Sequence, residues 1–135
     1  MPTFEKPSVD ADEAAAALRG LAHATRALDD PAQLYSILGS LSQGLASLEQ
    51  VLHQLGQFHD GPARQRGWRS GDAQADRAAP YQEAWELHRA AEMIHQVAAA
   101  LDRAHEIEAT IAYDHRHVPS LANERHPRAD NGLSL

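Results

Sequence analysis

Carboxylates and imidazoles spaced one helical turn apart are the residues of this 135-residue chain best suited to metal chemistry. Glu92 and His95 are three residues apart, Glu49 and His53 are four apart, and His88 precedes His95 by seven. These spacings put each pair on one face of a helix. The Glu-x-x-His spacing also occurs in di-metal carboxylate bundles, where every ligand points into the core. Here both pairs lie at the edge of the apolar positions, which favours paired side chains on a solvated face. A carboxylate–histidine metal site is therefore the second alternative, and no cofactor is expected.

A short cationic segment offers a different chemistry. Arg64, Arg66 and Arg69 surround Trp68 in an otherwise acidic chain of net charge -7. Arginine binds phosphate with two parallel hydrogen bonds, and a tryptophan stacks on a nucleic-acid base. The segment is therefore a candidate contact for nucleic acid or for an acidic protein partner, although the net charge opposes general nucleic-acid binding. A linker kept in solution by its charges is the simpler interpretation.

Catalytic signatures are absent from the sequence. The chain has no cysteine, which excludes disulfides, thiolate metal sites and cysteine nucleophiles. No serine stands in a Gly-x-Ser-x-Gly elbow, and no glycine-rich phosphate loop precedes a helix. We therefore expect no enzymatic activity. The first residues contain no apolar signal-peptide region, and no apolar run approaches the roughly 18 residues of a membrane span. These features predict a soluble, cytoplasmic protein without membrane contact.

A heptad pattern of leucines dominates the elements that must position these groups. Asp30 and Pro31 form a helix start, because aspartate caps the helix and proline at the first position loses no hydrogen bond. From there a helix is predicted over 31–58, with leucines alternately four and three residues apart, which is an a/d coiled-coil seam. Gly44 beside this seam suggests close helix approach, whereas Gly39 has no evident reason. The leucine seam consists of Leu34, Leu38, Leu41, Leu45, Leu48, Leu52 and Leu55.

Two further helices complete the prediction of an all-α fold. Asp10 and Glu13 resemble a capping box, which starts a helix over about 10–28. A longer helix is predicted over about 81–113. Since the helices over 31–58 and 81–113 are long and amphipathic, they should pack as an antiparallel hairpin with the shorter helix alongside. The predicted organisation is a flexible 1–9, a helical-bundle domain over 10–114 with a long loop at 60–80, and a flexible tail over 115–135.

The leucine seam is the basis of the functional hypotheses. It is larger than one short and one thinning helix can cover, and exposed apolar surfaces of that size mark interfaces. We therefore predict a homodimer with a four-helix core. The leading hypothesis is a non-catalytic helical interaction or oligomerisation module with a protein partner. The alternative is an accessory nucleic-acid-binding protein that uses the Arg/Trp segment. The competing architecture is a self-contained three-helix monomer.

Overall fold

The computed structural model describes residues 1–58 and 75–113, the side chains of 75–77 excepted, and most of these residues are helical. The elements are α1 (Pro7–Ala24), a 3-10 turn η1 (Thr25–Ala27), α2 (Pro31–Phe58) and α4 (Ala75–Thr110), with no strand among the described residues. The all-α, three-helix prediction is confirmed. None of these helices combines the length and the apolar content needed to cross a bilayer.

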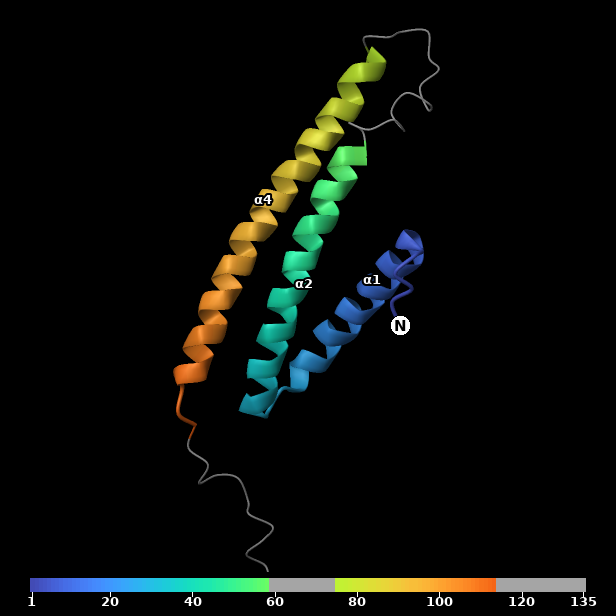
Figure 1. The fold of residues 1–135 in the computed structure, drawn as a ribbon. Coiled ribbons are helices and arrows are strands. Elements are labelled where there is room, and N and C mark those ends of the chain that lie inside the picture. The colour runs from blue at the N-terminus through green and yellow to red at the C-terminus, as the bar shows by residue number, and fades with distance from the viewer. Residues whose placement is uncertain (59–74, 114–135) are drawn as a thin grey trace, which may run out of the picture.

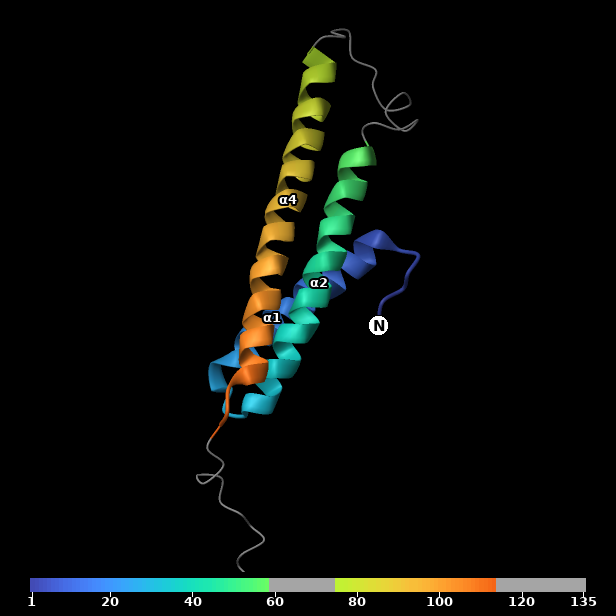
Figure 2. The same ribbon diagram turned by 60° about the vertical axis from the view of Figure 1, so that its left-hand side comes forward.

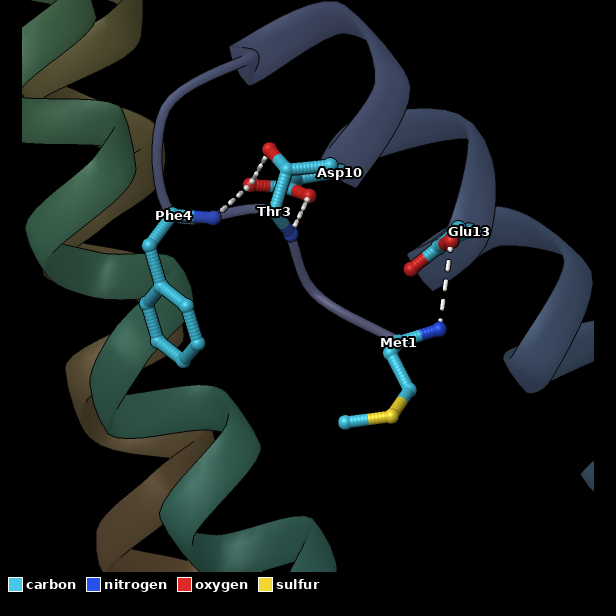
Figure 3. Close-up of polar contacts among 5 residues, drawn as sticks. All are labelled: Met1, Thr3, Phe4, Asp10 and Glu13. Atoms are coloured by element: carbon cyan, nitrogen blue, oxygen red, sulfur yellow. Dashed lines mark hydrogen bonds and ion pairs between the residues drawn. The ribbon is translucent and has the colours of Figure 1, made fainter.

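Helix α1 starts earlier than the sequence predicts, at Pro7 rather than near Asp10. The predicted capping box at Asp10 is wrong. Asp10 lies within the helix, and its carboxylate accepts hydrogen bonds from the residues that precede the helix (Figure 3). Its carboxylate accepts the Thr3 amide at 2.7 Å and the Phe4 amide at 3.2 Å. The Thr3 hydroxyl in turn accepts the amides of Glu5 and Lys6. Side-chain oxygens thus satisfy backbone N–H groups just before the helix, as helix starts require.

The start of helix α2 agrees with the prediction at Asp30 and Pro31. The Asp30 carboxylate accepts the amide of Ala32 at 2.9 Å, and its carbonyl accepts the amide of Gln33 at 3.0 Å. Pro31 occupies the first helical position, where an N–H has no intrahelical partner. The helix then continues for 28 residues to Phe58, as the leucine periodicity predicts.

Helix α4 begins at Ala75, so the prediction that Pro80 ends the loop is wrong. The residues before Pro80 include alanines and Arg77, which have high helix propensity. They continue the helix past the proline, although Pro80 lacks the N–H that would bond to the carbonyl of Asp76. At its other end α4 stops at Thr110, whose hydroxyl donates to the carbonyl of Ile107 at 2.7 Å.

Helices α2 and α4 lie side by side along their length and form the antiparallel hairpin that the sequence predicts (Figure 1). Helix α1 meets α2 at the end where the two are connected and then diverges from it at an angle towards its N-terminus (Figure 1 and Figure 2). The packing is therefore extensive within the hairpin and sparse between α1 and the hairpin.

The apolar core is very small. Among the described residues, the buried hydrophobic side chains are those of Ala84 and Ala91, and no large side chain is fully buried. None of the seven leucines of the leucine seam is buried, and Leu55 is 51 % exposed. A bundle normally buries its a/d positions internally, whereas here Leu48 and Leu55 are exposed and the other five leucines are only half-buried.

Candidate functional site

Small and polar side chains take part in the contact between α2 and α4. On α2 the contacting residues follow the leucine seam one position later and repeat with the same heptad period. One residue is about 100° of helix rotation, so this polar seam faces α4 while the leucines lie to one side. The polar seam comprises Tyr35, Gly39, Ser42, Glu49, His53 and Gly56 of α2, with His88, Glu92, His95, Asp102 and His105 of α4.

In the middle of the polar seam, two side-chain hydrogen bonds join α2 to α4. The His95 Nδ1 atom lies 3.1 Å from the Glu49 Oε2 atom. Two turns away, the Ser42 hydroxyl donates to the Asp102 carboxylate. Glu49 is 25 % exposed and His95 is 64 % exposed, so this ion pair lies at the edge of the helix contact. Partly exposed pairs of this kind add little free energy, but they fix the register of the two helices.

Two histidines meet at the Phe58 end of the hairpin. The Nδ1 atoms of His53 and His88 are 2.9 Å apart, and the ring centroids are 5.2 Å apart. The other His53 nitrogen, Nε2, lies 4.0 Å from the Glu92 carboxylate. The His88 ring also lies against the backbone of Gly56, where an added Cβ would stand 2.7 Å from the His88 Nε2 atom. A glycine is therefore needed at position 56 to accommodate this ring.

A third histidine lies at the opposite end of the polar seam. The His105 ring packs on Tyr35 with 4.2 Å between ring centroids, and its Cε1 atom would stand 3.3 Å from a Cβ placed on Gly39. This contact supplies the reason for Gly39 that the sequence does not show. The His105 Nε2 atom is buried and has no hydrogen-bond partner among the described residues.

A buried carboxylate lies close to this end of the hairpin. The Glu108 side chain is buried, and it accepts a hydrogen bond from the Tyr113 hydroxyl just beyond α4. This hydrogen bond, with lesser contributions from desolvation and from the Glu108 charge, raises the pKa of Tyr113 above its usual value of 10.0. The carboxylate thus ties the residues after α4 back onto the helix.

The four weak metal candidates of the sequence lie together on neighbouring turns of the polar seam. Glu49 pairs with His95, and His53 faces Glu92. Glu92 and His95 are 68 % and 64 % exposed, whereas Glu49 and His53 are 25 % and 34 % exposed, so the four side chains lie at the edge of the contact between α2 and α4. In the part of the chain that the structure describes, no three histidine, aspartate or glutamate side chains are placed to hold a metal ion. The arrangement shown is one of pairwise bonds between helices.

The leucine seam borders a large apolar groove between α1 and α2. The groove has a volume of about 530 Å³. Leu41, Leu45 and Leu48 of the leucine seam line it, whereas the remaining four leucines do not. On the α1 side it is lined by Leu18 and Leu21 together with two alanines, and Gly44 lies in its floor with nothing within 4 Å of an added Cβ. No residue of the described chain fills this groove.

The candidate nucleic-acid contact Arg64, Arg66, Trp68 and Arg69 lies outside the described residues. The predicted loop over 60–80 is described only from residue 75 onward, where it is helical, and the predicted tail over 115–135 also lies outside. The nucleic-acid hypothesis therefore stays a prediction from sequence.

Sequence reasoning missed that Tyr35, Ser42, Gly56 and Asp102 contact the partner helix. The signal was present, since 35, 39, 42, 49, 53 and 56, with Ala46 at the remaining position, repeat with the same spacing as the leucines. The pattern is not evident from apolar residues, because glycine, serine, histidine and glutamate are also typical of a solvent-exposed helix face.

The comparisons with known proteins give no relative. No protein-family model, no curated protein and no solved structure matches this chain.

Proposed function

We propose that this protein is a non-catalytic helical module that self-associates, a second copy of the chain covering the leucine seam and the groove between α1 and α2. The observation that carries the proposal is the near absence of a core. Ala84 and Ala91 alone are buried among the described apolar side chains, while Leu18, Leu48 and Leu55 are exposed by 58 %, 39 % and 51 %.

Folding free energy is the physical reason that this surface needs a cover. Ordering each residue costs about 1–2 kcal/mol of conformational entropy, and burial of apolar surface is the main compensation. Among the described residues, two buried alanines and the half-buried leucines supply only part of it. The uncovered leucines form a connected surface on α2 and α1. Its burial would add the apolar contact that the single chain lacks.

A second copy of the chain is the best candidate to cover the groove and the leucine seam. A cover required for stable packing must be present whenever the chain is folded. A second copy always accompanies the first in equal amount, whereas an unrelated partner does not. The groove wall is almost entirely apolar, with Ser36 and Ser40 as its polar residues. Two copies can therefore associate through this groove without placing charged side chains in the contact, which suits an interface because interface cores are typically depleted in charge.

Sedimentation equilibrium at micromolar concentration tests the proposal. We expect the mass of a dimer for the wild-type chain. Leu48→Glu should weaken the dimer at least about 100-fold, because each copy would bring a carboxylate into an apolar contact, at a cost of several kcal/mol.

Ile107→Glu is the matched control, since Ile107 is exposed on α4 and does not line the groove. It introduces the same charge and should leave the mass unchanged. Because both positions are exposed in the single chain, neither change disturbs packing within one copy, and only Leu48→Glu should lose stability through loss of the dimer. A monomer mass for the wild type, or equal loss of the dimer in both variants, contradicts the proposal.

A further inference from the structure

Helix α1 has an apolar face that is wider than a contact with one helix requires. At about 100° of rotation per residue, the alanines and leucines between residues 11 and 22 cover an uninterrupted arc of about 160°. A stripe of about 100° is enough for a helix that packs on one surface. The wide face comprises Ala11, Ala14, Ala15, Ala17, Leu18, Leu21 and Ala22. Leu21 is half-buried, the other six residues are exposed, and no residue of α1 is buried.

The groove between α1 and α2 takes up only one side of the wide face. The residues of α1 that line the groove are Ala14, Ala17, Leu18 and Leu21. Ala11, Ala15 and Ala22 lie on the other side of Leu18, do not line the groove and are exposed. Because α1 diverges from α2 towards its N-terminus (Figure 2), the chain's own α2 does not cover this second side. The wide face therefore has room for further neighbours.

The shape of this region suits a pair of chains related by a two-fold axis. In such a pair the same surface of both copies forms the contact, so the surface must be complementary to itself. Here the surface has a ridge, which is α1, and a hollow, which is the groove of about 530 Å³. Self-complementarity is reached when the ridge of each copy lies in the hollow of the other.

We propose that α1 of each chain is an arm that packs over the groove of a second copy, so that the two α1 and the two α2 helices form the core of the dimer. Each α1 then has three neighbours, namely its own α2, the partner's α1 and the partner's α2. Leu21, Leu18 and Ala15 point in three successive directions about 60° apart, one toward each neighbour. This inference rests on the proposed self-association and adds which segment of the second copy makes the contact.

The positions of the charged side chains agree with this arrangement. Between residues 11 and 22 the charged side chains of α1 are those of Asp12, Glu13 and Arg19, and all three lie outside the apolar arc. From Pro31 to Leu48, helix α2 carries no charged side chain. The two arms therefore bring no charge into the shared core, and interface cores are typically depleted in charge.

Two neighbouring alanines of α1 give a matched test by sedimentation equilibrium. Ala15 lies on the wide face, whereas Ala16 is about 100° further round and lies outside it. Both are exposed in the single chain, so circular dichroism should show equal helicity for the two variants. Ala15→Glu should weaken the dimer at least about tenfold, because it brings a carboxylate against the partner's α2. Ala16→Glu should leave the dissociation constant within about twofold of the wild type, as surface substitutions usually do.

Ala15 does not line the groove, so this test separates the arm contact from self-association in general. A wild-type dimer that Ala15→Glu leaves unaffected overturns the arm contact while the self-association stands. Equal weakening by Ala15→Glu and Ala16→Glu also overturns it. A monomeric wild type overturns the proposed function, and the arm contact with it.

Chemical cross-linking gives a second test, because the chain has no cysteine of its own. Ala14→Cys and Leu18→Cys place a thiol on the side of α1 that faces the second α1. Ala16→Cys and Arg19→Cys place it on the other side. With a short bismaleimide, at a concentration where the wild type is dimeric, one or both of the first pair should form covalent dimers faster than either control. Equal rates in the two pairs, or no covalent dimer from the first pair, would show that another segment covers the groove.

Discussion

At the scale of single residues, the chain uses side chains to fold its first residues back onto α1. Phe4 has a φ of 62°, in the left-handed region that side chains other than glycine rarely adopt. The Asp10 carboxylate accepts the amides of Thr3 and Phe4 and so stabilises this conformation. The N-terminal amine adds an ion pair with Glu13 at 3.3 Å (Figure 3). These contacts order a segment that its two prolines mark as an irregular lead-in.

The ionisation of Asp10 should control this turn. The hydrogen bond from the Thr3 amide is the main cause that lowers the pKa of Asp10 below its usual value of 3.8. A lowered pKa in the folded state means that the contribution is fully present above about pH 3.8. It is lost as the pH falls through the lower, folded value. In an NMR titration, the Thr3 amide proton should shift upfield as the carboxylate is protonated.

Asp10→Asn should give this acid-form shift at neutral pH, whereas Asp12→Asn, at an exposed neighbouring position, should not. A Thr3 amide signal that stays constant down to pH 2, or that responds equally to both substitutions, would show that Asp10 does not hold the turn.

At the scale of the elements, Pro31 and Pro80 have different positions in their helices. Pro31 is the first residue of α2, where it costs no hydrogen bond. Pro80 lies inside α4 and interrupts the bonding of the turn before it. Helix α4 therefore consists of a long part packed on α2 and a first turn and a half whose backbone bonding is weakened by its own sequence.

Substitution of Pro80 should strengthen this beginning of α4. Pro80→Ala restores an N–H that can bond to the carbonyl of Asp76 and replaces the least helix-compatible residue by the most compatible one, a difference of up to about 3 kcal/mol in a helix interior. We expect slower amide exchange and a higher helical Cα chemical shift over 75–80.

Pro31→Ala is the control, because a proline at the first helical position already suits the helix. It should leave α2 unchanged or slightly weaker. If Pro80→Ala left the exchange rates over 75–80 unaltered, or if both substitutions had the same effect, the helical bonding around Pro80 would not be the limiting feature.

At the scale of the whole molecule, the chain combines a well-registered hairpin with an uncovered apolar surface. The polar seam fixes how α2 and α4 lie, through Glu49–His95, Ser42–Asp102 and His53–His88. It contributes little apolar burial. The leucine seam has the opposite character, with apolar side chains and no complete cover. If the proposed self-association holds, register and stability come from different faces of the same helix.

The proposed self-association should make the stability depend on protein concentration. A partner that binds the folded chain stabilises it by mass action, by about 2.7 kcal/mol at 100 times the dissociation constant. Raising the protein concentration 100-fold should therefore raise Tm by several degrees, as followed by circular dichroism. The same dilution series on Leu48→Glu should give a low Tm that no longer depends on concentration. A concentration-independent Tm in the wild type would indicate a folded monomer.

The sequence alone determined the elements that depend on neighbouring residues. The cap at Asp30, the proline at 31 and the leucine period placed α2, and the same kind of pattern predicted the antiparallel hairpin. The start of α4 was misplaced, because Pro80 is an unfavourable helix residue whose effect the favourable residues before it overcome. The start of α1 was also misplaced, because Thr3 and Asp10 hold the chain before Pro7 in a way that the capping-box pattern does not describe.

Only the tertiary structure decided which face of α2 meets which neighbour. Two adjacent rows on this helix, the leucines and the polar seam one residue later, share one heptad period, so periodicity cannot distinguish them. Gly39, Ser42 and Gly56 allow α4 to approach closely on the polar row, where the rings of His105 and His88 fill the space above the two glycines. The fit of these rings depends on residues about 30 to 65 positions away along the chain, and local pattern holds no information about it.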